Sequence, residues 1–468
     1  MPVSRPLALA ILLVLLGGCS LGPDYARPDV ATPAGWDSRS DAAGLWPDAE
    51  WWRQFGSSEL DALIAEAKTS STDMRAAAAR IRQAEAQAKI AGAALYPSLD
   101  AGGGAGRYWQ GSSSGTGNRN SFSGDLTAGY QVDLFGANSA SAASALTSLE
   151  ASRYDRETVA ITLYSDIAAT YFQLLSLRDR IRLSSETLRT VEDTLDLLVR
   201  QRQLGVSTEY EVAQQRSAVA SQRGSLSALQ QSERQTLDAL AVLLGRNPQG
   251  FRVAGSTLDS LSLPPVAAGL PSELLLRRPD LRRAEADLRS ANYDIAAARA
   301  ARFPSLSIAA SAGSAAASAG ALFEPATMAY SIAASLTAPI FQGGRLQGQE
   351  ELARARNDEI VENYRAAILS AFRDTEDALD ATASTAEQFD YAREAFEQAN
   401  EAYRIVQARY AAGTVDFLDL LVAQRTVFAA NDTLVQAAFS RYAAIVDLYT
   451  ALGGGWDGNV TETTASAD

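Results

Sequence analysis

The sequence predicts a mainly α-helical, internally duplicated protein that also contributes β-strands to a membrane. Motifs of the first half recur about 207 residues later, since Tyr96-Pro97-Ser98-Leu99 is matched by Phe303-Pro304-Ser305-Leu306. In each half, a hairpin with a two-residue hydrophobic period is followed by more than sixty residues without glycine or proline. Membrane strands joined to helices of that length indicate a conduit rather than an enzyme.

The composition narrows the chemistry that the chain can perform. The sequence has no histidine, one cysteine and a net charge of -14. Without histidine or a second cysteine, the common metal sites and triad-type nucleophiles are missing, so we expect no cofactor and no enzymatic activity. A hydrolase that uses only carboxylates is the enzymatic alternative that remains open. The acidic charge argues against a nucleic-acid partner.

The N-terminus is typical of a bacterial lipoprotein. Arg5 precedes an apolar run from Leu7 to Leu16 that fits a signal peptide and is too short to span a bilayer. The run ends in Leu16-Gly17-Gly18-Cys19, which resembles a lipobox. We therefore expect residues 1–18 to be removed and Cys19 to carry a lipid anchor that includes palmitate. The alternative is an ordinary cleaved signal with an incidental cysteine.

An extended tether and a first helix are expected to follow the lipid. Ser20 stands directly after the cysteine, as in lipoproteins that are sent to the outer membrane. Residues 19–57 are rich in proline, glycine, aspartate and tryptophan and show no period, which predicts a lipid-anchored N-terminal tether. A helix is expected from Ser58 to Ala94, with Ser57 or Ser58 as its N-cap.

The first β-hairpin is predicted at about 97–135 and the second at about 304–342. From Ser121 to Leu134 apolar and polar residues alternate over about the length of a tilted outer-membrane strand. Ser98 to Trp109 is a glycine-rich version of the same pattern, and Gly111 to Asn120 is expected to be a polar loop. Aromatic residues at both ends of the first hairpin fit the girdles of a membrane barrel: Tyr96, Tyr108, Trp109, Phe122 and Phe135.

Four strands cannot close a membrane barrel within one chain. Such barrels begin at about eight strands, and an open edge in lipid leaves backbone groups unpaired. The barrel is therefore expected to be shared, with twelve strands from three chains or eight from two. A soluble hairpin with one wet face would show the same alternation, but the outward aromatic residues favour the membrane.

Two long helical hairpins are predicted, at residues 137–244 and 345–452. The stretch from Ala137 to Leu204 would be about 100 Å long as one helix. Its second half keeps a 4,3 spacing of apolar residues over about five heptads, which specifies left-handed supercoiling against a partner helix. Gly205 and Gly413 are expected to end the long helices as C-caps before a return helix begins.

These elements divide the chain into two repeats. The first repeat is expected at residues 58–245 and the second at 273–452. A linker with four prolines joins them at 246–272, and residues 453–468 form a short polar tail.

Several motifs stand in order along the mature chain: Gly22-Pro23-Asp24-Tyr25, Trp51-Trp52 with Phe55, Leu134-Phe135-Gly136, Pro271-Ser272-Glu273-Leu274-Leu275, Arg277-Arg278-Pro279-Asp280-Leu281, Pro339-Ile340-Phe341 and Leu452-Gly453-Gly454-Gly455-Trp456. They resemble the TolC-like outer-membrane efflux channel family, in its lipoprotein branch of NodT- and OprM-like outer-membrane factors. The resemblance implies a homotrimer in the cell outer membrane, whose twelve-stranded β-barrel continues into a periplasmic helical barrel. It also implies docking to a periplasmic adaptor (membrane fusion) protein and an inner-membrane RND-type pump.

The motif Arg277-Arg278-Pro279-Asp280 also has a structural interpretation. Asp280 beside Pro279 is a helix-start signal, and the arginines can neutralise neighbouring carboxylates. We favour this interpretation over direct contact with a transported compound.

The resemblance places a periplasmic gate at the tips of the helical hairpins, where charged and aromatic side chains form rings by symmetry. The matching residues of the second copy are Arg409, Tyr410, Asp416, Leu418 and Asp419. Leu418 matches an apolar constriction, and Arg409 and Tyr410 match side chains that tie neighbouring helices together. In the first copy, comparable places are held by Arg202, Glu209 and Glu211.

One position departs from the family pattern. Family members often carry an acidic residue before the Ala-Gln-Arg that here is Ala423-Gln424-Arg425, whereas this chain has Val422. Asp416 or Asp419 would then supply an acidic ring a turn lower. Each tip charge would also fit a solvated position on a coiled coil.

The expected function is a passive exit duct for small amphiphilic compounds, opened by its partners. Acidic charge along the lumen would favour cations. A duct for ABC-driven protein secretion would share the architecture, but the lipid cysteine favours drug-type efflux because protein-secreting relatives more often lack it. A periplasmic coiled-coil scaffold lipoprotein would explain the helices and Cys19 but not the two alternating hairpins.

Overall fold

The computed structural model describes residues 22–37, 47–112, 115–265 and 271–458, so Cys19 lies outside the described residues. The described elements of the first copy are η1 (Trp51–Phe55), α2 (Ser58–Ser70), α3 (Thr72–Ala93), β1 (Ser98–Ser112), β2 (Gly115–Val132), α4 (Ala137–Gln203), α5 (Glu209–Leu243) and η2 (Leu258–Ser260). Those of the second copy are α6 (Pro271–Arg277), α7 (Pro279–Ala300), β3 (Ser305–Ala316), η3 (Gly320–Phe323), η4 (Pro325–Thr327), β4 (Met328–Thr337), α8 (Arg345–Ala411) and α9 (Phe417–Ala451).

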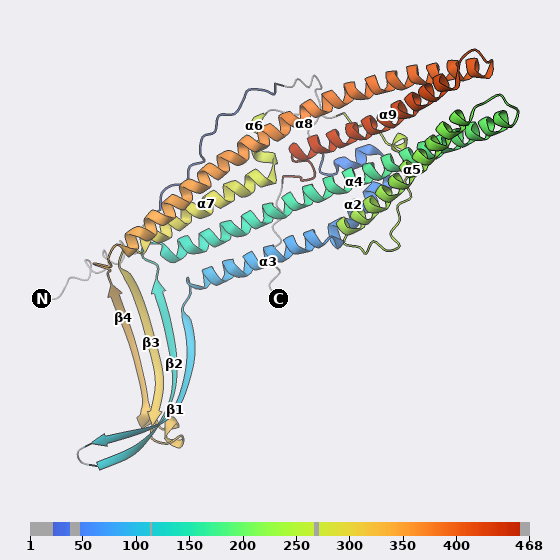
Figure 1. Ribbon diagram of the computed structural model, residues 1–468. Helices are drawn as coiled ribbons and strands as arrows, with labels where there is room; N and C mark the ends of the chain where they lie inside the picture. The colour runs from blue at the N-terminus through green and yellow to red at the C-terminus, as the bar shows by residue number, and fades with distance from the viewer. Residues whose placement is uncertain (1–21, 38–46, 113–114, 266–270, 459–468) are drawn as a thin grey trace. The chain divides into compact units, whose positions relative to one another are not determined.

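The two predicted hairpins join into one antiparallel sheet with the order β1-β2-β3-β4 (Figure 1). β2 of the first copy pairs with β3 of the second, for example through Tyr130 and Ile308. Paired residues share a face, so the predicted alternation gives one apolar and one polar face. β1 and β4 form the two edges of the sheet, and their outer backbone groups have no partner strand within the described chain.

The strands differ from the prediction at their ends. The polar loop predicted from Gly111 to Asn120 is wrong, because β1 continues to Ser112, which pairs with Gly115 at the start of β2. Polar residues can pair in this way because the backbone alone supplies the ladder of hydrogen bonds. β4 ends at Thr337, two residues before Pro339, which has no N–H to donate to a ladder.

The predicted helix from Ser58 to Ala94 is two helices. α2 ends at Ser70, and Ser71 has an extended ψ of 136° before α3 begins. The Ser70 hydroxyl lies 2.6 Å from the carbonyl of Leu244 at the end of α5 and 2.9 Å from that of Glu66 in its own helix, so it has an acceptor in each. The predicted N-cap is confirmed, since the Ser57 hydroxyl accepts a hydrogen bond from the Leu60 N–H at 3.2 Å.

The long helical hairpins are confirmed. α4 and α8 each run for 67 residues, and α5 and α9 each run for 35. Gly205 and Gly413 follow the long helices with φ of 76° and 69°, the left-handed conformation that ends many helices. In the described part of the chain, no helix combines the length and apolar character needed to cross a bilayer.

The chain forms two compact units that we name by their contents. The sheet unit contains residues up to 30, 80–153 and 283–366, and the hairpin unit contains residues 31–79, 154–282 and from 367 onward. In the hairpin unit, Trp51 is fully buried and stacks on Tyr449 with 4.9 Å between ring centroids. The Trp-Trp-x-x-Phe segment of η1 therefore forms part of an aromatic core.

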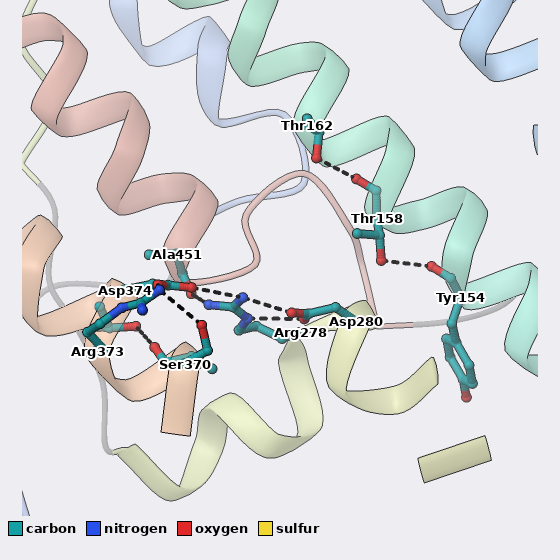
Figure 2. Close-up of polar contacts among 11 residues, drawn as sticks. Tyr154, Thr158, Thr162, Arg278, Asp280, Ser370, Arg373, Asp374 and Ala451 are labelled. Atoms are coloured by element: carbon teal, nitrogen blue, oxygen red, sulfur yellow. Dashed lines mark hydrogen bonds and ion pairs between the residues drawn. The ribbon is translucent and has the colours of Figure 1, made fainter. Parts of the chain in front are cut away.

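Arg278 joins three segments of the hairpin unit (Figure 2). Its guanidinium donates to both carboxylate oxygens of Asp280, at 3.1 and 2.8 Å, and to the carbonyl of Ala451 at the end of α9, at 3.1 Å. Asp374 of α8 lies 3.6 Å away. Arg278 is mostly buried, so the structural interpretation of this motif, an arginine that neutralises carboxylates, agrees with the structure.

The N-terminal segment is anchored within the sheet unit. Arg27 donates two hydrogen bonds to Glu285 of α7, and the Asn292 side chain donates to the carbonyl of Pro23 at 2.9 Å. Burial, reinforced by the charge of Glu285, raises the pKa of Tyr25 to about 12. The segment has no regular secondary structure from 22 to 31, and its side chains hold it on the helices instead.

Candidate functional site at the hairpin tips

The tip of the first hairpin is closed by a capping box. Thr208 is the N-cap of α5: its hydroxyl accepts from the Glu211 N–H, and the Glu211 carboxylate accepts from the Thr208 N–H at 2.6 Å. The Ser207 hydroxyl also donates to the carbonyl of Leu198 at 2.8 Å. Glu211 therefore has a local structural role that satisfies two backbone groups at the helix start.

The other two first-copy residues form an ion pair with each other. Arg202 at the end of α4 contacts Glu209 at the start of α5, and Arg216 reaches the same carboxylate at 3.7 Å. All three side chains are at least half exposed. Exposed ion pairs of this kind contribute little to the stability of the chain. Because these side chains are exposed, their charges are accessible to a neighbouring molecule.

The tip of the second hairpin is capped by Asp416. Its carboxylate accepts a hydrogen bond from the Asp419 N–H at 3.0 Å, which satisfies one orphan N–H of α9. The hydroxyl and the N–H of Thr414 both donate to the carbonyl of Arg409, at 3.0 and 2.9 Å. The loop around Gly413 is thus held by its own polar groups, and the negative charge of Asp416 stands at a helix N-terminus.

An apolar cluster joins the two tips of the hairpin unit. Its buried members come from both hairpins: Leu198, Val212, Phe417, Leu420 and Leu421. Tyr410 packs against this cluster, with its ring centroid 6.3 Å from that of Phe417. The two hairpin tips of one chain therefore pack against each other through this cluster.

Tyr410 also makes a polar contact between the hairpins. Its hydroxyl donates to the side-chain oxygen of Gln201 in α4 at 3.4 Å. Burial and the nearby charge of Glu211 raise the pKa of this tyrosine. Gln201 was not among the predicted site residues, because nothing in its sequence context marks it as the partner of a residue 209 positions away.

The remaining predicted residues point away from the cluster. Leu418 is 56% exposed although Phe417 and Leu420 on α9 are buried, and Val422, one turn later, is equally exposed. Arg409 is exposed, and its guanidinium has no hydrogen bond or ion pair with any residue that the structure describes. Two apolar side chains and one arginine are thus presented outward at the second tip.

Two buried glutamines were not among the residues predicted from the sequence. Gln215 of α5 is fully buried and donates to the carbonyl of Val191 at 2.7 Å, and Gln424 of α9 is 2% exposed. They occupy matching Gln-Arg-(Ser/Thr) motifs of the two copies, which was the available signal. A buried amide favours packing that gives it a partner, so the bond from Gln215 to Val191 restricts how α5 packs on α4.

Comparisons with known proteins agree with this architecture. A family model described as "Outer membrane efflux protein" matches residues 63–246 and 270–454. The chain is 42% identical over 465 residues to the pyoverdine export outer membrane protein OpmQ of Pseudomonas aeruginosa, a match covering 97% of each. It is 34% identical to the probable efflux pump outer membrane protein TtgC of Pseudomonas putida, covering 96% of this chain and 95% of the relative. A solved structure of the outer-membrane channel OprN matches with a TM-score of 0.87 and 27% identity, covering 94% of this chain and all of that one.

Proposed function

We propose, from the premise that this chain belongs to the outer membrane efflux protein family, that three copies assemble into the exit duct of a tripartite pump. The chain is an outer-membrane channel of an efflux system with a large helical periplasmic part, and it is not an enzyme. The observation that carries the assembly is the four-stranded sheet with two open edges. Pairing β1 of one copy with β4 of the next would remove both edges and close a twelve-stranded barrel from three copies.

The partners of this proposal are a periplasmic adaptor and an inner-membrane RND-type pump. Cys19, outside the described residues, would anchor each copy in the outer membrane through its lipid. The repeats at 58–245 and 273–452 would each supply one β-hairpin and one helical hairpin. The segment at 19–57 would precede them, although its end is not an extended tether, because Trp51–Phe55 packs in the aromatic core. The tail at 453–468 would follow them. Energy for transport would come from the pump, because a channel of this kind conducts passively.

The gate of the proposed duct lies at the hairpin tips. Leu418 and Val422 would form an apolar constriction, since both are exposed on one side of α9. Arg409, Asp416 and Asp419 would form charged rings, and the Arg202–Glu209 pair with the capped Glu211 would flank them. The contact of Tyr410 with Gln201 supports a role in holding the two hairpins together.

The proposed cargo is small amphiphilic compounds. OpmQ is named for pyoverdine export and TtgC for efflux, which supports small molecules over polypeptides for this chain as well. A protein-secretion duct is the second candidate within the same architecture, but no observation here favours it.

The test is the conductance of purified Cys19→Ser protein in a planar bilayer, with the mass of its oligomer measured in detergent on the same sample. We expect a trimer with small, rarely opening currents. A monomer or dimer without conductance would contradict the shared barrel.

A further inference from the structure

The β1–β2 hairpin continues beyond the rest of the sheet. The last residue of β3, Ala316, pairs with Phe122, and the part of β2 that precedes Phe122 pairs with β1 alone. Figure 1 shows this two-stranded extension turning sharply out of the direction of the four-stranded part of the sheet. β1 follows α3 and β2 leads into α4 at the opposite end of the sheet. In an outer-membrane channel with periplasmic helices, the extension is therefore at the cell-surface side.

The register decides which residues of the extension share a face. Arg107 pairs with Asn120, which is two residues from Phe122 on β2, so Arg107 belongs to the apolar face. Arg119 pairs with Tyr108 and lies on the opposite, polar face. The prediction that Tyr108 faces outward with Trp109 is therefore wrong, because successive residues of a strand point to opposite faces. The two arginines are at the same level of one hairpin, have the same charge and are both exposed, but they point in opposite directions.

Arg107 is the single charged residue on the apolar face of the four strands as far as the structure describes them. Its guanidinium forms no hydrogen bond or ion pair within that described part of the chain. Trp109, on the same face, is 72% exposed. The apolar run of this face ends at Phe122, and Arg107 and Asn120 follow it at the next level of the face. An arginine beside a tryptophan at such a change from apolar to polar residues marks a boundary between lipid and polar headgroups.

We propose that Arg107 and Trp109 bind the phosphorylated sugar headgroup of lipopolysaccharide in the outer leaflet. This inference rests on the proposed barrel, because barrel closure directs the apolar face toward lipid. A guanidinium holds phosphate through two parallel hydrogen bonds, and an indole ring packs on a sugar face while its N–H stays in the polar layer. The chain carries a net charge of -14, so an anionic lipid would approach it at an exposed positive group rather than elsewhere on its surface.

The test compares two variants that each remove one arginine charge at the same level of the hairpin, Arg107 on the apolar face or Arg119 on the polar face. Purified trimers of the wild type, Arg107→Gln and Arg119→Gln would be titrated in detergent with lipopolysaccharide and with phosphatase-treated lipopolysaccharide. We expect Arg107→Gln to weaken binding of the phosphorylated form about five- to tenfold, as loss of a charge-assisted contact would, and Arg119→Gln to change it less than about twofold. Dephosphorylation should remove the difference between wild type and Arg107→Gln.

Three outcomes would overturn the inference. Equal weakening in both variants would indicate general attraction to positive charge, and no weakening in Arg107→Gln would leave the residue without this role. Equal binding of the phosphatase-treated lipid would exclude phosphate as the recognised group. Conductance of the same trimers separates this test from that of the duct: a conducting trimer that fails the lipid test loses only the proposed headgroup site.

Discussion

At the scale of single residues, Glu350 shows how the sheet unit is stabilised by charge. This carboxylate of α8 is 4% exposed and accepts hydrogen bonds from Arg302, Arg299 and Arg354. The hydrogen bond from Arg302, followed by those from the other two arginines, lowers the pKa of Glu350 from 4.5 to about 2. One buried negative charge therefore links the end of α7 to α8.

Replacing Glu350 by glutamine should destabilise the protein in a pH-dependent way. The folded pKa is depressed, so the stabilisation is complete above the ordinary pKa of 4.5 and is lost as the pH falls through about 2. We expect Glu350→Gln to lower the free energy of unfolding by about 1–2 kcal/mol at neutral pH. The difference in unfolding free energy between the variant and the wild type should disappear as the pH falls from 4.5 to about 2. Thermal unfolding of both proteins across this range measures it, with the exposed Glu362→Gln as control. A gap that stays constant with pH would contradict the assignment.

The charges of the second tip can be tested without losing its helix cap. Asp416→Asn removes the charge and keeps an N-cap oxygen, because asparagine caps a helix as well as aspartate. Combined with Arg409→Gln, it should raise the open probability of single channels if these rings hold the closed state. The control is Glu401→Gln with Arg404→Gln, which removes an exposed pair within α8. Unchanged opening in the Arg409 and Asp416 double variant would count against these residues as a lock.

At the scale of elements, the duplication reappears in how the return helices end. Gly245 follows α5 with φ of 71°, and a Cβ there would overlap the carbonyl oxygen of Ser70 at the end of α2. Gly453 follows α9 with φ of 74°, and a Cβ there would meet the carbonyl oxygen of Arg277 at 3.0 Å. Each return helix thus ends on a short helix of its own copy, with the backbones in close approach.

Gly245→Ala should be much more harmful than the same change at Gly205. Both positions have a left-handed φ, which costs alanine about 1 kcal/mol. Nothing lies within 4 Å of a Cβ at Gly205, whereas Gly245 has the Ser70 backbone against it. We expect an extra loss of about 1–3 kcal/mol for Gly245→Ala from this overlap. Unfolding of the two variants in urea compares them, and equal losses would show that conformation alone matters at both sites.

The sequence predicts these elements unevenly, for physical reasons. The Ser57 cap and the turns at Gly205 and Gly413 follow from local chemistry, which the sequence displays directly. The break at Ser71 and the contact of Tyr410 with Gln201 depend on which side chain meets a distant backbone or helix. Local propensity does not contain that information, so these features appear only in the structure.

At the scale of the whole molecule, the sheet defines what a lumen would contain. Its apolar face has one charge in the described strands, Arg107, whereas Asp100 and Asp125 lie on the polar face that would line the barrel. Asp125 pairs with Gly102 on one side and Gly313 on the other. A Cβ at either glycine would come within 2.8 Å of Asp125, so both neighbours leave the carboxylate open.

Asp125 should therefore set part of the cation preference of the duct. Three copies would place three carboxylates at one level of the lumen, each flanked by glycine, and such a ring attracts cations. We expect Asp125→Asn to roughly halve the ratio of cation to anion permeability, as read from the reversal potential in a salt gradient across a planar bilayer. Ser123→Asn is the matched control, because it adds an amide on the same face without changing charge. If both variants shift the reversal potential equally, bulk rather than charge acts at this level. If neither does, the ions are selected elsewhere, and the acidic tip residues Asp416 and Asp419 become the next positions to neutralise.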